Sequence, residues 1–105
     1  MVSNLEYYKV FYHVARLGSL TTAAQALSIS QPAVSQSVRQ LEQQLGVSLF
    51  YRVAKGVRLT KEGETLFEYV AGGYEQLEMG EQRLRRMRDL EAGEIRIGAS
   101  DMTLQ

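Results

Sequence analysis

The sequence predicts a mostly α-helical fold in which three short helices and a two-stranded β-ribbon precede one long helix. Three observations carry this prediction. Apolar residues recur at helical spacing between capping residues in the first part of the chain. Two short apolar runs then flank a glycine-containing turn, and a seven-residue apolar repeat follows over residues 66–87. The 105 residues leave room for one small domain and one long element.

Capping residues delimit the first two helices. Ser3 and Glu6 have the spacing of a capping box, which predicts the start of the first helix, and Gly18 is expected to end it. Ser19 can cap a short second helix. The apolar side of that second helix is expected to consist of Leu20, Ala23, Ala24 and Leu27.

A third helix is predicted to begin at Ser30 and to end at Gly46. Pro32 is compatible with its first turn, because the first amides of a helix have no intrahelical partner. The buried stripe of this helix is expected to consist of Val34, Val38, Leu41 and Leu45.

Residues 48–52 and 57–59 are predicted to form the β-ribbon. The turn between them contains Gly56, which can supply a positive φ, and Lys55, which makes the tip basic. Thr60 is then expected to cap the long helix.

The long helix is expected to run to about Leu90 and to be broken by Gly93. Residues 94–98 alternate like a β-strand. We therefore expect three parts. Residues 1–60 form a first domain, residues 61–91 form a linker and dimerisation helix, and residues 92–105 hold the first strand of a further domain that is missing.

The charges are distributed unevenly along the chain. Twelve basic and twelve acidic side chains give a net charge of zero. Residues 1–60 hold six basic and two acidic side chains, a balance of +4, whereas residues 61–105 hold six basic and ten acidic ones, a balance of −4. The first part therefore fits a polyanionic partner, which the neutral total conceals.

Several classes of protein are excluded by composition. The chain has no cysteine, so it has neither disulfides nor a thiolate zinc site. His13 is the single histidine, which argues against a Ser-His-Asp triad or a histidine-rich metal site. There is no apolar run of membrane-spanning length. Since an acid/base pair and a phosphate-binding loop are also lacking, we expect no enzyme and no membrane association.

Three helices followed by a β-ribbon describe a winged helix-turn-helix. The third helix has the outward side chains that base reading requires, because Gln and Arg match the hydrogen-bonding edges of adenine and guanine. A glutamine-rich solvated surface is the alternative reading. The outward side chains are Gln31, Ser35, Gln36, Arg39, Gln40, Gln43 and Gln44.

Four stretches resemble the LysR-type transcriptional regulators. Residues 18–36 and 38–50 are similar to the N-terminal signature of that family, and residues 52–63 match its wing. Residues 93–98 resemble the entry to the family's effector-binding domain.

The resemblance implies sequence-specific binding of double-stranded DNA, with residues 31–45 in the major groove and residues 49–59 near the minor groove. At Gln36 and Lys55 many members of the family carry Arg, which puts the inherited base preference in doubt. The expected DNA-contacting residues are Thr22, Ser30, Gln31, Pro32, Ser35, Gln36, Arg39, Arg52, Lys55 and Arg58.

Three of these residues have an alternative reading. Arg39 could pair with Glu42 or Glu6, Arg58 could be a solvated charge, and Thr22 could serve only the start of its helix.

The long helix carries a heptad seam, which predicts a homodimer formed by an antiparallel helix pair. Glycines on this seam would let a second helix approach closely. The alternative is that the seam packs against its own domain, as we expect near Leu66. The predicted interface consists of Leu66, Val70, Gly73, Tyr74, Leu77, Gly80, Leu84 and Met87.

By resemblance, the full-length regulator is a cytoplasmic bacterial homotetramer that responds to a small-molecule coinducer. That ligand belongs to the effector domain, so no cofactor is expected in the present residues. Two rival classes remain: a MarR-like winged-helix dimer, and a winged-helix module that contacts only protein.

Overall fold

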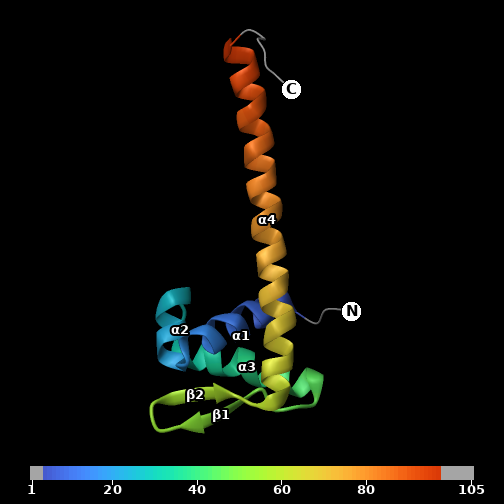
Figure 1. The fold of residues 1–105 in the computed structure, drawn as a ribbon. Helices are drawn as coiled ribbons and strands as arrows, with labels where there is room; N and C mark the ends of the chain where they lie inside the picture. The colour runs from blue at the N-terminus through green and yellow to red at the C-terminus, as the bar shows by residue number, and fades with distance from the viewer. Residues whose placement is uncertain (1–3, 98–105) are drawn as a thin grey trace. The chain divides into compact units, whose positions relative to one another are not determined.

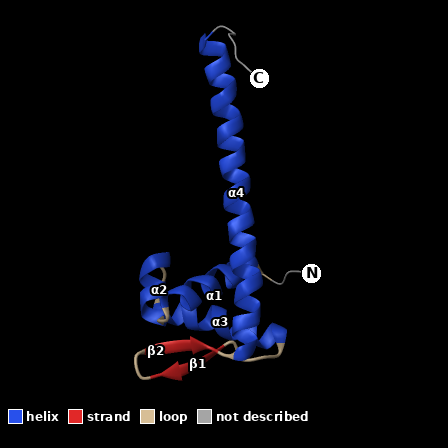
Figure 2. Ribbon diagram, viewed as in Figure 1, coloured by secondary structure: helices blue, strands red, loops and turns tan. Residues whose placement is uncertain are grey.

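The computed structural model describes residues 4–97, and its elements follow the predicted order (Figure 1). Figure 2 shows that helices dominate and that the two strands form one small ribbon. The predicted mostly helical, winged fold is therefore confirmed. The elements are α1 (Leu5–Leu17), α2 (Leu20–Leu27), α3 (Gln31–Leu45), β1 (Phe50–Val53), β2 (Gly56–Leu59) and α4 (Lys61–Ile97).

The helix ends are fixed by local hydrogen bonds. The Ser19 hydroxyl accepts from the N–H of Thr22 at 3.1 Å, and the Ser30 hydroxyl accepts from the N–H of Ala33 at 3.2 Å. These two caps are confirmed. At the start of α1 the cap is Asn4, whose side chain accepts from the N–H of Glu6, whereas the expected Ser3 lies outside the described residues.

Two apolar clusters form the core of the first compact unit, which ends at Ala71. The first cluster joins α1, α2, α3 and β2 through Val10, Val14, Ala23, Ala24, Val34, Val38 and Val57. The second consists of the fully buried Phe11, Leu41 and Leu49.

One core prediction was wrong: Leu45 is 38% exposed. It occupies the last turn of α3, and Leu49 enters the core from the connection that follows, with only 1% of its surface exposed. The periodicity of α3 therefore continues one turn beyond its buried part.

The ribbon is antiparallel and pairs Tyr51 with Arg58 and Arg52 with Val57. Gly56 has a φ of +140°, as the predicted positive-φ turn requires. The ribbon is also attached to the helices, because the N–H of Val57 donates to the carbonyl oxygen of Gly18 at 3.1 Å.

The helix α4 is longer than predicted, since it passes through Gly93 and ends at Ile97. The expected helix boundary near residue 91 and the expected strand over 94–98 were therefore wrong as far as Ile97; Gly98 and the residues after it lie outside the described part of the chain. A strand needs a partner strand for its hydrogen bonds, whereas helical bonds are local and one glycine costs only about 1 kcal/mol. Within the described residues, no helix has the length and apolar character to cross a membrane.

Candidate nucleic-acid interface

The recognition face of α3 is defined by the burial of its opposite side. Val34, Val38 and Leu41 are buried against the core, while Gln36 and Arg39 are exposed. The first carboxylate of α3 is Glu42, in its fourth turn. The outward surface therefore presents amide, hydroxyl and guanidinium groups, as predicted.

Hydrogen bonds along α3 order part of this face. The Gln31 amide nitrogen donates to the Ser35 hydroxyl at 3.2 Å, and Arg39 donates to the Gln36 side-chain oxygen at 3.4 Å. Arg39 is thus bonded to Gln36, while the carboxylate of Glu42, one of the acidic partners considered for it, accepts from the backbone amides of Leu49 and Phe50.

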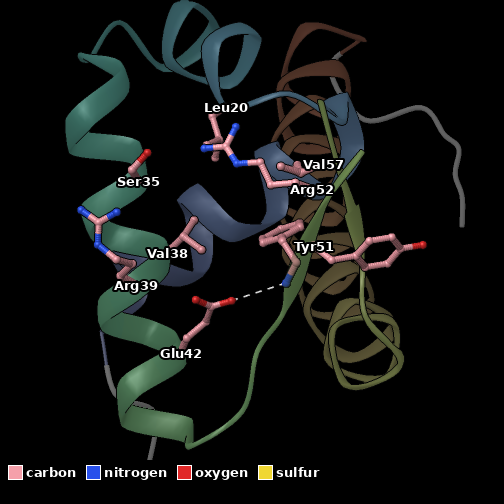
Figure 3. Close-up of a pocket in the computed structure, with 9 residues that line it drawn as sticks. Leu20, Ser35, Val38, Arg39, Glu42, Tyr51, Arg52 and Val57 are labelled. Carbon is pink, nitrogen blue, oxygen red and sulfur yellow. Dashed lines mark hydrogen bonds between the residues drawn. The ribbon is translucent and has the colours of Figure 1, made fainter. Parts of the chain in front are cut away.

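A cavity of about 210 Å³ separates α3 from the ribbon. Figure 3 shows Arg52 extending from β1 into this space, with Ser35 and Arg39 on the facing helix. The fold therefore brings three of the predicted contact residues together around one cavity. Its lining consists of Leu20, Ser35, Val38, Arg39, Glu42, Phe50, Tyr51, Arg52 and Val57.

Arg58 is separated from these residues. Side chains alternate between the two faces of a strand, and Arg58 pairs with Tyr51 whereas Arg52 pairs with Val57. Arg58 consequently lies on the other face of the ribbon, where it lines a second cavity with Arg16 and Glu64. Its predicted contact is not on the surface that α3 shares with Arg52.

The remaining predicted contacts lie at the ends of elements. Lys55 occupies the exposed turn between β1 and β2, and Thr22 is exposed in the first turn of α2. Ser30 caps α3, and Pro32 is exposed in its first turn. These positions are accessible to a large ligand.

Sequence reasoning missed the role of Glu42. Its carboxylate accepts the N–H of Leu49 at 2.7 Å and that of Phe50 at 3.4 Å, so it ties α3 to the base of the ribbon. The available signal was a single carboxylate in a helix otherwise free of acidic residues. Gly63 was also missed: a Cβ there would collide with the carbonyl oxygen of Leu49.

The predicted dimer seam is divided between two environments. Leu66 and Val70 pack against the cluster of Phe11, Leu41 and Leu49, so these two residues are engaged within their own chain. This packing is the one expected near Leu66, and both side chains remain only partly buried in it. Tyr74 is partly buried, while Gly73 and Gly80 are exposed. The large apolar members of the seam's second half are exposed: Leu77, Leu84 and Met87.

Three helices, an attached ribbon and a polar outer face on the third helix define a winged helix-turn-helix domain, a class of DNA-binding module. Residues 5–64 match the family described as bacterial regulatory helix-turn-helix protein, lysR family. The chain belongs to this LysR family.

Similar proteins share this assignment. The RuBisCO operon transcriptional regulator of Allochromatium vinosum is 41% identical over 97 residues, which are 92% of this chain and 32% of that protein. The HTH-type transcriptional regulator YtlI of Bacillus subtilis is 40% identical over 95 residues, which are 90% of this chain and 30% of that protein. The chain thus spans about a third of the length of these relatives.

Solved structures of two DNA complexes have the same fold. The BenM_DBD/catB site 1 DNA complex aligns with a TM-score of 0.73 at 28% identity, over 82% of this chain and 97% of that one. The CbnR_DBD-DNA complex aligns with a TM-score of 0.69 at 30% identity, over 82% and 99%.

Proposed function

We propose that this chain binds double-stranded DNA sequence-specifically as the reading domain of a bacterial transcriptional regulator, with no enzymatic activity. In this proposal α3 enters the major groove and the ribbon lies near the minor groove. The single observation that carries it is the outer face of α3, which presents Gln36 and Arg39 and has no carboxylate in its first three turns.

Two further observations support the proposal. Residues 1–60 carry the balance of +4, and the cavity between α3 and the ribbon brings Arg39 and Arg52 to the same side of the domain. BenM and CbnR have been solved as DNA complexes, and their domains match 97% and 99% of their own length to this chain.

Different residues have different roles in this proposal. Gln36 reads a base edge, with adenine as its matching base, because an amide can both donate to N7 and accept from the exocyclic amine. Lys55 contacts phosphate, so its contribution is independent of sequence. Arg52 and Arg39 contribute positive charge that attracts the phosphates. The other predicted residues are assigned contacts with the DNA backbone or contacts that support the reading residues: Thr22, Ser30, Gln31, Pro32, Ser35 and Arg58.

The test is a binding titration against salt with a two-fold promoter duplex and a scrambled duplex. We expect log K to fall steeply with log salt, by about 0.9 per phosphate contacted, and the promoter duplex to be preferred. Gln36→Ala should reduce the preference between duplexes, whereas Lys55→Ala should weaken binding to both alike. Negligible affinity at low salt would favour a module that contacts only protein.

We also propose that the second half of α4 forms the homodimer. Leu77 is 67% exposed and Leu84 66% exposed, and together with Gly73 and Gly80 they recur at heptad spacing. A Cβ at either glycine would have nothing within 4 Å in this chain, so each leaves an open hollow on the seam. Exposed leucines beside hollows are the complementary parts of a helix–helix contact.

One antiparallel register fills each hollow with a leucine. If the two-fold axis passes between Glu78 and Met79, Leu77 faces Gly80 of the partner and Leu84 faces Gly73 of the partner. Leucine opposite glycine conserves the packed volume of each layer and lets the backbones approach. This register gives the seam glycines a function.

Because the chain has no cysteine, the register can be tested by introducing cysteines. The double variant Gly73→Cys/Leu84→Cys is expected to form an intermolecular disulfide. Each single variant is not, since an antiparallel pair separates its two copies of that residue by eleven residues, about 16 Å along the axis. Efficient crosslinking of either single variant would indicate a parallel pair instead.

A charge in the seam tests the dimer itself. We expect Leu77→Glu to give monomers in sedimentation equilibrium, because it would bury a carboxylate against apolar groups. Glu78→Gln, an exposed neighbour on the same helix, serves as the control and should remain dimeric. An unchanged dimer in Leu77→Glu would refute the seam.

For the full-length regulator, we propose a cytoplasmic homotetramer whose effector domain binds a small-molecule coinducer. The support is the length of the relatives, of which this chain matches about a third. Native mass spectrometry is expected to give a dimer for this chain and a tetramer for a chain extended through such a domain. A dimer for the extended chain would count against the tetramer.

A further inference from the structure

The connection between α3 and β1 is held from two sides at a single residue, Leu49. Its N–H donates to the Glu42 carboxylate of α3 at 2.7 Å. Its carbonyl oxygen accepts from the N–H of Thr60, the residue before α4, at 2.9 Å. Its side chain is 1% exposed in the core. The N–H, the carbonyl oxygen and the side chain of Leu49 are thus all engaged.

The neighbouring contacts reinforce this attachment. The same Glu42 oxygen also accepts from the N–H of Phe50, the first residue of β1, at 3.4 Å. The Thr60 hydroxyl donates to the carbonyl oxygen of Ser48 at 2.6 Å. Gly63 in the first turn of α4 lies so close to the Leu49 carbonyl that a Cβ would not fit. The ribbon base is therefore wedged between α3 and the start of α4.

The charge of Glu42 is unfavourable for the function of the surface around it. Glu42 lines the cavity that Arg39 and Arg52 share, where a carboxylate repels phosphate. A glutamine would give one acceptor without this cost. A carboxylate oxygen is the stronger acceptor for two backbone N–H groups, because charge-assisted hydrogen bonds are about twice as strong as neutral ones.

We propose that Glu42 is a positioning residue: its carboxylate fixes the ribbon relative to α3, so that Lys55 and the face of α3 contact one DNA molecule in a single register. This inference rests on the proposed DNA binding. It assigns the hydrogen-bonded anchor at the base of the ribbon to one side chain that does not itself contact DNA. Without the carboxylate, β1 keeps its pairing with β2 and the ribbon keeps its packed side chains, but the hydrogen bonds from Leu49 and Phe50 to α3 are lost.

The test is a double-mutant cycle between Glu42 and Lys55 on the whole chain. In the wild type, Lys55→Ala is expected to lower the salt slope by about 0.9, the value of one phosphate contact. In Glu42→Ala, the same change is expected to have little effect on slope or affinity. The two changes should deviate from additivity by at least about twofold in Kd, as coupled residues do.

Matched variants separate the hydrogen bonds from the charge. Glu42→Gln keeps an acceptor oxygen and should largely restore the Lys55 dependence. Glu42→Leu removes the acceptor while keeping helix propensity and bulk, and it replaces Glu42→Ala if that variant does not fold. Glu68→Ala removes an exposed acid of α4 and should be additive with Lys55→Ala.

A measurement without DNA tests the attachment directly. Hydrogen exchange of the Leu49 and Phe50 amides should accelerate at least tenfold in Glu42→Leu, with no comparable change within α1. Unchanged exchange, or strict additivity with Lys55→Ala in a chain that binds DNA, would overturn the inference. Absence of DNA binding by the wild type would instead overturn the proposed function and leave the exchange result to decide the attachment.

Discussion

The backbone of Gly56 in the ribbon lies directly against the carbonyl group of Gly18, the residue that ends α1. A Cβ on Gly56 would collide with the Gly18 carbonyl oxygen, and the next amide, that of Val57, donates to that same oxygen at 3.1 Å. The tip of the ribbon is thereby attached to the turn between α1 and α2.

Gly56→Ala is expected to destabilise the domain by about 2–3 kcal/mol, because it combines a disfavoured φ with a backbone collision. The measurement is urea unfolding followed by circular dichroism. Gly46→Ala is the control, since Gly46 also has a positive φ, +74°, but a Cβ there meets nothing within 4 Å. It should cost only about 1 kcal/mol. Equal losses would mean that the contact with Gly18 contributes nothing.

Two glycines of α4 should respond in opposite directions to alanine. Gly72→Ala should stabilise by about 1 kcal/mol through helix propensity, because a Cβ there has open space. Gly63→Ala should destabilise despite the same gain, since its Cβ would displace the carbonyl of Leu49. Thermal unfolding of both variants decides this, and a stabilised Gly63→Ala would contradict the described contact.

Leu41 and Leu45 lie one turn apart on α3 and differ in burial. Leu41 is fully buried beside Phe11, so Leu41→Ala should cost about 2–5 kcal/mol through lost packing and the cavity left behind. Leu45→Ala should cost less than about 1 kcal/mol, because Leu45 is 38% exposed. The comparison is made by denaturant unfolding. Comparable losses of unfolding free energy in the two variants would indicate that Leu45 belongs to the core.

Substitutions at Ser30 can separate the stability of α3 from its affinity for DNA. Ser30→Ala removes the cap on Ala33 and should cost about 1 kcal/mol in unfolding free energy. Ser30→Asp should keep that stability, since aspartate is an equally good cap, yet weaken DNA binding by repelling phosphate. Unfolding curves and binding isotherms of the two variants provide the check. Full DNA affinity in Ser30→Asp would place the start of α3 away from the phosphates.

Local chemistry made much of the fold predictable from sequence. Helix caps and terminal glycines act within a few residues of the chain. The structure confirms the caps at Ser19, Ser30 and Thr60 and the helix ends at Gly18 and Gly46. The three-residue and four-residue spacing of apolar side chains likewise predicts which face of α3 is buried. These signals depend only on neighbours in sequence.

Burial and end points that depend on distant partners were not predictable in this way. The helical pattern of α3 continues through Leu45, but whether that turn is covered depends on where Leu49 enters the core. The alternation after Gly93 suggests a strand, but with no partner strand among the described residues the segment as far as Ile97 is helical.

The order of the elements up to α4, the polar outer face of α3 and the heptad seam of α4 were all predictable from residue spacing. The packing of Val70 against the core, the position of Arg58 on the ribbon face opposite Arg52, and the link from Glu42 to β1 became visible only in the folded chain. Each of these features depends on contacts between different elements of the fold. Residue spacing along the chain does not encode such contacts.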